Sequence, residues 1–247
     1  MKALSLLLLL TTLVSLFSLT ACGKPELTVG VGQSVTVSGV AEASAQDNGS
    51  ADIAYTVCAL FLDQEGRIVD LKLDALEFTM AYTASGEALS IARLKSKNAL
   101  GEDYGMKAAG VPLEWYEQAE AFASVCIGKT LDGVLSLATE DGKGSPEVIK
   151  AGCTIRVSEF VKAVADAYDE AKDGVAAKRG ELSLTLTATQ RGKDATERDE
   201  GEVEVNTSIL AIYGDAPTAR DEEFLKARLV FDASGKLLCD KDEIVTQ

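Results

Sequence analysis

The nucleophiles and metal ligands available to this 247-residue chain are limited by two facts: it has five cysteines and no histidine. The absence of histidine excludes Ser-His-Asp and Cys-His catalysis, histidine-based zinc sites and imidazole pH switches. Four cysteines, Cys58, Cys126, Cys153 and Cys239, are not in CxxC spacing, which argues against a zinc ribbon or a thioredoxin-type pair. Each lies in an apolar run, which favours buried thiols, whereas an oxidising compartment would favour two disulfides.

The fifth cysteine, Cys22, is placed for lipid attachment. A lysine and an apolar run over 3–17 precede the four residues Leu19 to Cys22, which look like a lipobox at the end of an export signal. The thiol would take a diacylglyceryl group before cleavage, and two or three acyl chains anchor a protein stably. A plain secretory signal or a single anchor helix is the alternative. We therefore expect a signal peptide over 1–21, a lipidated tether over 22–29 and an extracytoplasmic protein anchored to the cell membrane.

The chain is acidic, with 39 Asp and Glu against 24 Lys and Arg and a formal net charge of −15. Nucleic acid and anionic lipid surfaces are therefore poor partners. Acidic clusters at 194–204 and 215–223 lack the ligand spacing of a calcium loop, so we expect solvated loops and no metal. No Ser-x-x-Lys occurs at a helix start, and no other catalytic constellation is found. The interpretation therefore leans away from an enzyme.

Strands are the first elements that would position a site. Residues 27–38 alternate in the manner of a strand, and 53–62 and 67–78 flank a glycine-containing turn, which predicts a β-hairpin. Residues 79–92 are expected to continue the sheet. A long loop is expected over 95–110, where no period is visible.

Helices follow that loop. Pro112 is expected to open the first main helix, and Ser158 to cap the second. A short helix is expected over 130–138, a loop over 140–147 and a buried strand over 152–157. The apolar stripes that predict the main helices are Trp115, Ala119, Phe122 and Cys126 in the first, and Phe160, Val161, Val164, Ala165 and Tyr168 in the second.

The C-terminal part predicts a second, mainly-β unit with strands at 182–189, 202–213 and 225–232. Within it, 202–210 matches 52–60 as a weak internal repeat, although two alternating strands can also look alike by chance. The predicted fold class is α+β: a twisted antiparallel sheet covered by two main helices in a module over 30–175. The smaller module over 176–247 is either a truncated repeat or an unrelated unit.

The most distinctive stretch contains a Tyr-Gly-Met loop beginning at Tyr104 and a Glu-Trp-Tyr-Glu-Gln segment around Trp115. It resembles an uncharacterised family of envelope lipoproteins from anaerobic Gram-positive bacteria, over roughly residues 27–172. That resemblance implies a relative and no activity. Trp115 and its neighbour pin the loop to the core in one interpretation, and form an aromatic platform for a small planar ligand in the other.

A second resemblance lies in 151–158, where Gly152, Cys153 and Thr154 precede the helix that starts near Ser158. With the upstream strand pair, this stretch looks like the FMN-binding domain of sodium-pumping and electron-transfer membrane complexes. The resemblance implies that Thr154 would meet the flavin phosphate, with Gly152 allowing close backbone approach and Ser158 and the helix N-terminus donating N–H groups.

The departures from that pattern argue against a covalent flavin. Ala151 replaces a hydroxyl residue, Cys153 replaces alanine, and Val148 stands where the attachment motif has an aspartate. The sequence therefore predicts a non-catalytic ligand-binding or surface-structural lipoprotein without a cofactor, with an envelope protein or a small planar molecule as its partner. The alternative is a non-covalent FMN-binding electron-transfer protein.

Overall fold

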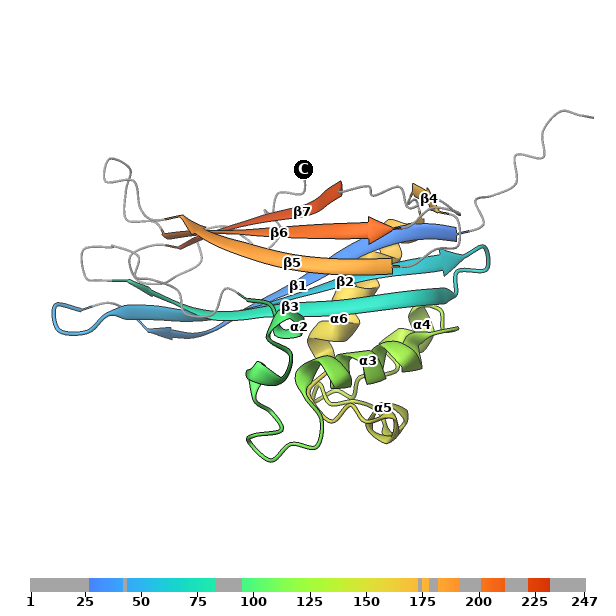
Figure 1. The fold of residues 1–247 in the computed structure, drawn as a ribbon, viewed down its shortest axis with the longest axis horizontal. Coiled ribbons are helices and arrows are strands. Elements are labelled where there is room, and N and C mark those ends of the chain that lie inside the picture. Colours follow the sequence, from blue (N-terminus) through green and yellow to red (C-terminus); the bar gives the residue numbers. More distant parts are fainter. Residues whose placement is uncertain are drawn as a thin grey trace, which may run out of the picture.

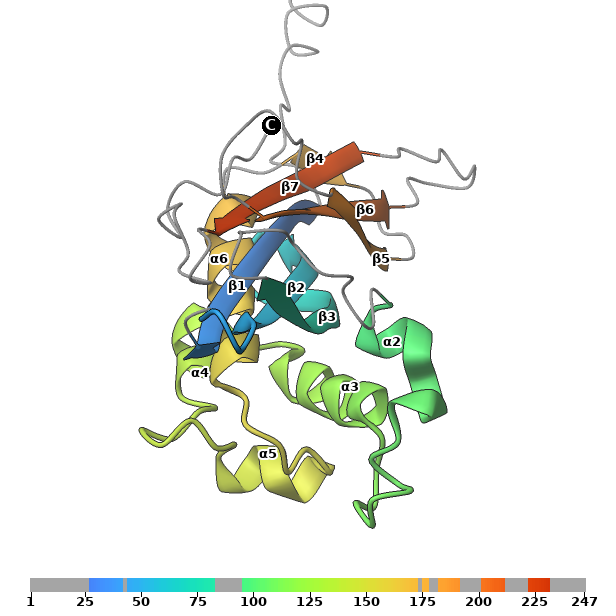
Figure 2. The ribbon, with the colours of Figure 1, turned by 90° about the vertical axis from the view of Figure 1, so that its left-hand side faces the viewer.

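The computed structural model describes residues 27–41, 44–82, 95–172, 175–177, 182–191, 201–211 and 222–231, which form an α+β fold (Figure 1). A four-stranded antiparallel sheet has helices on one face and a three-stranded antiparallel sheet on the other (Figures 1 and 2). The predicted fold class is therefore confirmed. The predicted signal peptide, Cys22, Cys239 and most of both acidic clusters lie outside the described residues.

The first sheet is a meander of three 15-residue strands, with a short fourth strand at one edge. Strands β1 (Leu27–Ala41), β2 (Gly49–Asp63) and β3 (Ile68–Tyr82) are antiparallel, in the order β3-β2-β1-β4. The predicted hairpin is confirmed, and Asp63 closes its turn by accepting the Arg67 N–H at 2.7 Å.

Two strand pairings lie at the predicted module boundaries. Strand β1 begins at Leu27, where the predicted strand begins, and Leu27 pairs with Asp63 of β2. Strand β4 (Val175–Ala177) crosses the predicted module boundary at 175 and adds to the first sheet beside β1. Neither pairing is visible to local sequence patterns, because the partners are distant in the chain.

The helical region departs from the predictions in three places. The expected loop over 95–110 contains two short helices, and the first main helix begins at Trp115, not Pro112, because Glu114 supplies the cap. The expected strand over 152–157 is irregular chain with one isolated bridge, between Arg156 and Lys143, because Gly152 ends a short preceding helix, Pro146–Ala151, in the left-handed conformation. The helices are α2 (Lys97–Leu100), the 3-10 helix η1 (Gly101–Tyr104), α3 (Trp115–Cys126), α4 (Leu131–Leu135), α5 (Pro146–Ala151) and α6 (Ser158–Lys172).

The two long helices lie against the same face of the first sheet, each along one of its outer long strands. Helix α6 runs antiparallel to β1, since Glu159 meets Thr36 and Ala171 meets Gly30. Helix α3 runs antiparallel to β3, with Gly128 beyond its C-terminal end donating to the carbonyl of Ile68. The core between helices and sheet contains the predicted stripe residues, all buried except Ala165, which is half-buried.

The opposite face of the first sheet carries a second set of buried side chains. They lie on β2 and β3 and include Tyr55, Val57, Phe61, Leu76 and Phe78. Strand β5 (Leu182–Arg191) lies over them, and Leu182 is itself buried. This face explains why β2 is apolar on both sides and lacks simple alternation.

The second sheet is a meander of β5, β6 (Gly201–Ala211) and β7 (Glu222–Phe231). The two segments of the predicted repeat, 52–60 and 202–210, are each in the middle strand of a three-stranded meander. No helix among the described residues is both long and apolar enough to cross a membrane.

Candidate functional site

Glu114 connects the Tyr-Gly-Met loop to the start of α3. Its carboxylate is almost fully buried and accepts the backbone N–H groups of Met106 and Lys107, both at 2.9 Å. It also forms a reciprocal capping box with Glu117, whose side chain accepts the Glu114 N–H at 2.7 Å. The loop conformation is therefore fixed by a carboxylate of the helix start.

Gln118, one turn further along α3, ties this region to the segment before α6. Its side-chain oxygen accepts the Thr154 N–H at 2.8 Å, the Thr154 hydroxyl at 3.1 Å and the Ile155 N–H at 3.2 Å. Its amide nitrogen donates to the Leu113 carbonyl at 3.1 Å. The two distinctive sequence segments thus meet at a buried glutamine that the aromatic pattern did not single out.

Tyr104 and Trp115 are brought together by one cation. The Lys97 ammonium lies 4.8 Å from the Tyr104 ring centroid and 5.4 Å from that of Trp115, and it pairs with Glu77 at 3.0 Å. Burial lowers the pKa of Lys97, although Glu77 acts against that shift. Trp115 is buried and packs edge-on against Phe160 of α6, so its ring is part of the core and is not an open platform.

The four residues of the flavin-like segment occupy different environments. Gly152 ends α5 with a φ of 114°, which favours glycine, and Cys153 is fully buried. Thr154 is exposed, but its hydroxyl and N–H both contact Gln118, as does the N–H of Ile155. Ser158 is the first residue of α6 and is half-buried. The donors that a phosphate would need at Thr154 and Ile155 are therefore engaged by the protein itself.

The three cysteines in the described part of the chain, Cys58, Cys126 and Cys153, are free and buried. Burial raises the pKa of Cys126 to about 12 and that of Cys153 to about 11, and raises that of Cys58 as well. Such thiols are unreactive packing groups. Among the described residues, no three acidic or cysteine side chains gather closely enough to hold a metal ion.

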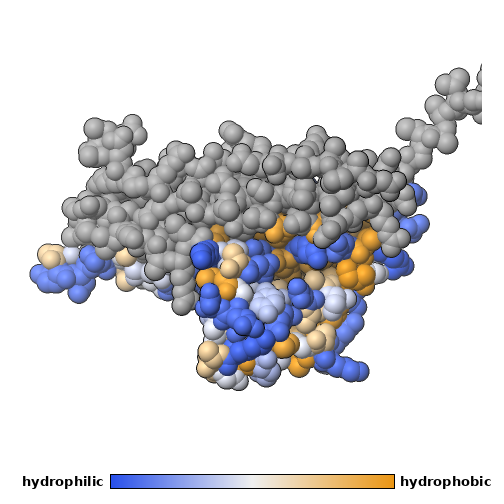
Figure 3. Space-filling view, viewed as in Figure 1, coloured by the Kyte–Doolittle hydropathy of each residue, from blue (hydrophilic) through white to orange (hydrophobic). Residues whose placement is uncertain are grey.

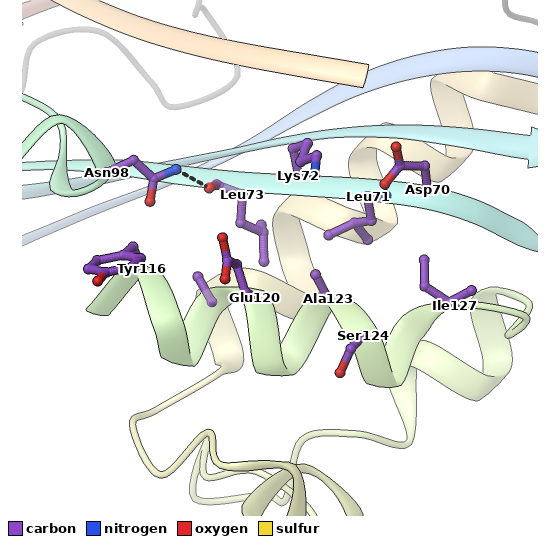
Figure 4. A pocket seen from close by; sticks show the side chains of 11 residues that line it. Asp70, Leu71, Lys72, Leu73, Asn98, Tyr116, Glu120, Ala123, Ser124 and Ile127 are labelled. Atoms are coloured by element: carbon purple, nitrogen blue, oxygen red, sulfur yellow. Dashed lines mark hydrogen bonds between the residues drawn. The ribbon is translucent and has the colours of Figure 1, made fainter. Parts of the chain in front are cut away.

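A groove runs between β3 and α3 (Figure 4). It encloses about 480 Å³. None of the six predicted cofactor residues lines it. The lining is contributed by β3 (Asp70, Leu71, Lys72, Leu73), by α2 (Asn98) and by α3 and the residue that follows it (Tyr116, Ala119, Glu120, Ala123, Ser124, Ile127).

The groove has an apolar floor and charged rims. Leu71 and Leu73 point from β3 toward Ala123 of α3, while the Glu120 carboxylate points up from the helix toward the strand (Figure 4). Tyr116 lies at one end and Ile127, an exposed isoleucine, at the other. Hydrophobic surface is visible among hydrophilic residues where the helices meet the sheet (Figure 3).

The edge of β3 along this groove is partly occupied by groups from the same chain. At one end, the Ile68 N–H donates to Lys129 and the Ile68 carbonyl accepts from Gly128, at 2.9 and 2.8 Å. At the other end, the side-chain amide of Asn98 donates to the Leu73 carbonyl at 2.8 Å. Between these ends, Asp70 accepts the Leu71 N–H through its own side chain at 2.8 Å.

No protein-family model, curated protein or solved structure matches this chain. The site is therefore interpreted from its own geometry.

Proposed function

We propose that this protein is a lipid-anchored, extracytoplasmic binding module without catalytic activity, and that the groove between β3 and α3 is its binding site. The observation that carries the proposal is this open groove, whose polar side chains either hydrogen-bond to backbone groups or face solvent. Asp70 and Asn98 hydrogen-bond to β3, and the Ser124 hydroxyl donates to the Ala121 carbonyl. A nucleophile paired with a base is not among the groove residues.

The anchor and the fold are close together in this proposal. Four residues separate Cys22 from Leu27, the first residue of β1, and an extended chain spans at most about 3.5 Å per residue. Leu27 pairs with Asp63, so the β2–β3 turn would face the membrane. The groove begins at Asp70, near that turn, and extends away from it.

Metabolic labelling with a radioactive or alkyne-bearing fatty acid tests the anchor. The full chain should be labelled and should sediment with membranes, whereas Cys22→Ala should lose the label. Cys239→Ala is the matched control and should keep it. A labelled Cys22→Ala chain, or an unlabelled wild type, would overturn the lipid-anchor proposal.

A flavin titration tests the non-catalytic part. The chain from Gly23 onward should show no flavin absorbance and should not quench FMN fluorescence, because Gln118 occupies the N–H donors at Thr154 and Ile155. Retention of FMN that is lost on Thr154→Ala would instead establish the electron-transfer alternative.

A further inference from the structure

The β3 edge in the groove is a short, exposed pairing edge. At one end, the backbone of Ile68 is hydrogen-bonded to the backbone of the chain after α3. At the other end, the Leu73 carbonyl accepts a hydrogen bond from the Asn98 side chain. The Leu73 carbonyl points away from β2 into this space, because it accepts from the Asn98 side chain. The backbone of an extended peptide could hydrogen-bond to the part of the β3 edge that lies between these two ends.

The opposite wall matches that edge in length. From Ile68 to Leu73, a strand rises about 17 Å at 3.3–3.4 Å per residue, and from Tyr116 to Ile127 a helix rises about 16 Å at 1.5 Å per residue. The groove residues of α3, from Tyr116 to Ser124, repeat at helical spacing, and Glu120 and Ala123 among them face β3 (Figure 4). An added strand of about five residues would match this length.

We propose that the groove binds an extended, cationic and apolar peptide segment, which adds to the edge of β3 as a short strand. This inference deepens the proposed function and rests on it. The peptide backbone would hydrogen-bond to the Leu71 carbonyl and the Leu73 N–H, because Asp70 and Asn98 already engage the Leu71 N–H and the Leu73 carbonyl. Alternate side chains of the peptide would point toward α3. Apolar side chains would contact Leu71, Leu73 and Ala123, and a cationic one would meet Glu120.

Charge complementarity selects a cationic occupant. The Glu120 carboxylate is exposed and points at the strand, Asp70 adds a second carboxylate on the β3 rim, and the whole chain carries a net charge of −15. Lys72 is the one cation among the groove residues, and it lies on the rim above β3 (Figure 4). An acidic peptide would be repelled by both carboxylates and by the negative charge of the whole chain.

A defined probe tests this proposal. The peptide is acetyl-Val-Thr-Lys-Thr-Val-amide with a fluorescent label, in which the lysine and both valines lie on one face of the extended chain. Its binding to the chain from Gly23 onward is followed by anisotropy. We expect saturable binding, weakened at least about tenfold by Glu120→Lys, a change of roughly 1.4 kcal/mol. Glu140→Lys, an equal charge change at an exposed site outside the groove, should alter the affinity less than about twofold.

A peptide N-methylated at alternate amides separates strand addition from charge attraction. It keeps the lysine but loses backbone donors, so it should bind at least about tenfold more weakly. In the complex with the unmodified peptide, hydrogen exchange at the Leu71–Leu73 amides should slow. Urea unfolding of Glu120→Lys should match wild type, which excludes misfolding as the cause.

Three results would overturn the peptide proposal: no detectable binding, equal binding of the N-methylated peptide, or equal weakening by Glu140→Lys. An unlabelled wild-type chain, a labelled Cys22→Ala chain or retention of FMN would contradict the proposed function instead, so the two failures are distinguishable.

Discussion

The two outer long strands of the first sheet each have a helix running antiparallel beside them, yet one edge is closed and the other is open. Helix α6 lies directly on β1, where a Cβ added to Gly32 would overlap the Ala167 nitrogen. Helix α3 is held away from β3 by the side chains of Leu71 and Leu73, and a groove remains. The difference comes from strand residues, since only glycine allows such close backbone approach.

The hydrogen bonds at the two edges differ in the same direction. On β1, carboxylates of α6 accept the free N–H groups: Glu170 that of Val31 at 2.6 Å and Asp166 that of Gln33 at 2.8 Å. On β3, the acceptors are the neighbouring carboxylates Asp70 and Asp74 of the strand itself. A helix that seals an edge can satisfy its backbone groups, whereas a helix at a distance leaves them to local side chains.

The largest effect is expected from Gly32→Ala. The new methyl group would collide with the backbone of α6 at Ala167 and Ala163, so the free energy of unfolding should fall by about 3 kcal/mol or more. Urea unfolding measures this change. Ser38→Ala, at an exposed position on the same strand, should change stability by less than about 0.5 kcal/mol. An unchanged midpoint for Gly32→Ala would mean that α6 does not lie at contact distance.

Gln118→Ala should lower the local stability of α3 and of the segment at Thr154 and Ile155, and leave β1 unaffected. It removes a buried oxygen that serves three donors at Thr154 and Ile155, at a cost of about 2–3 kcal/mol. Hydrogen exchange should accelerate first at Thr154 and Ile155 and in α3, while β1 amides keep their protection. Equal acceleration at both edges would show that the two helices unfold as one unit.

A smaller loss, about 1 kcal/mol, is expected from Asn98→Ala, which removes the donor to the Leu73 carbonyl. The open edge of β3 should lengthen by one carbonyl. In the peptide titration, affinity should therefore stay equal or rise. A clear loss of peptide affinity would assign Asn98 a direct contact with the peptide.

The smallest changes in the free energy of unfolding are expected for two carboxylates of α6, Glu159 and Glu170, and the two changes should have opposite signs. Burial alone would raise the pKa of Glu159, but hydrogen bonds from Ser34, Lys162 and Thr36 outweigh it and lower that pKa. Ionised Glu159 therefore stabilises the fold above its ordinary pKa near 4.5, and this contribution is lost as the pH falls through the lowered value. Glu159→Gln should cost a few tenths of a kcal/mol at pH 7, after allowance for solvent screening.

Glu170 behaves in the other direction, because burial raises its pKa despite the Val31 N–H. Its contribution is fully present below the ordinary pKa near 4.5 and is lost as the pH rises through the raised value. Glu170→Gln keeps an acceptor for Val31 and should gain a few tenths of a kcal/mol at pH 7. Urea unfolding at pH 4 and pH 7 checks both variants, and the same sign for the two would contradict this account.

Local sequence patterns predicted the elements whose cause is local. The hairpin around Asp63 follows from alternation and a glycine turn, and the buried stripes of α3 and α6 follow from helical periodicity. The segments around Trp115 and Thr154 are also distinctive in the sequence, where their aromatic and hydroxyl groups indicate a binding site. In the structure, the hydrogen bonds that hold these segments are made by the side chains of Glu114 and Gln118.

Only the tertiary structure decided which edge is closed and where the groove lies. The close fit of α6 depends on Gly30 and Gly32 meeting Ala163, Ala167 and Ala171 from more than 130 residues away. The groove likewise depends on β3, α2 and α3 coming together across the chain. Sequence periodicity shows which face of a helix or strand is apolar. The distance between two elements depends on the side chains of both, so that distance is fixed only when the elements pack together.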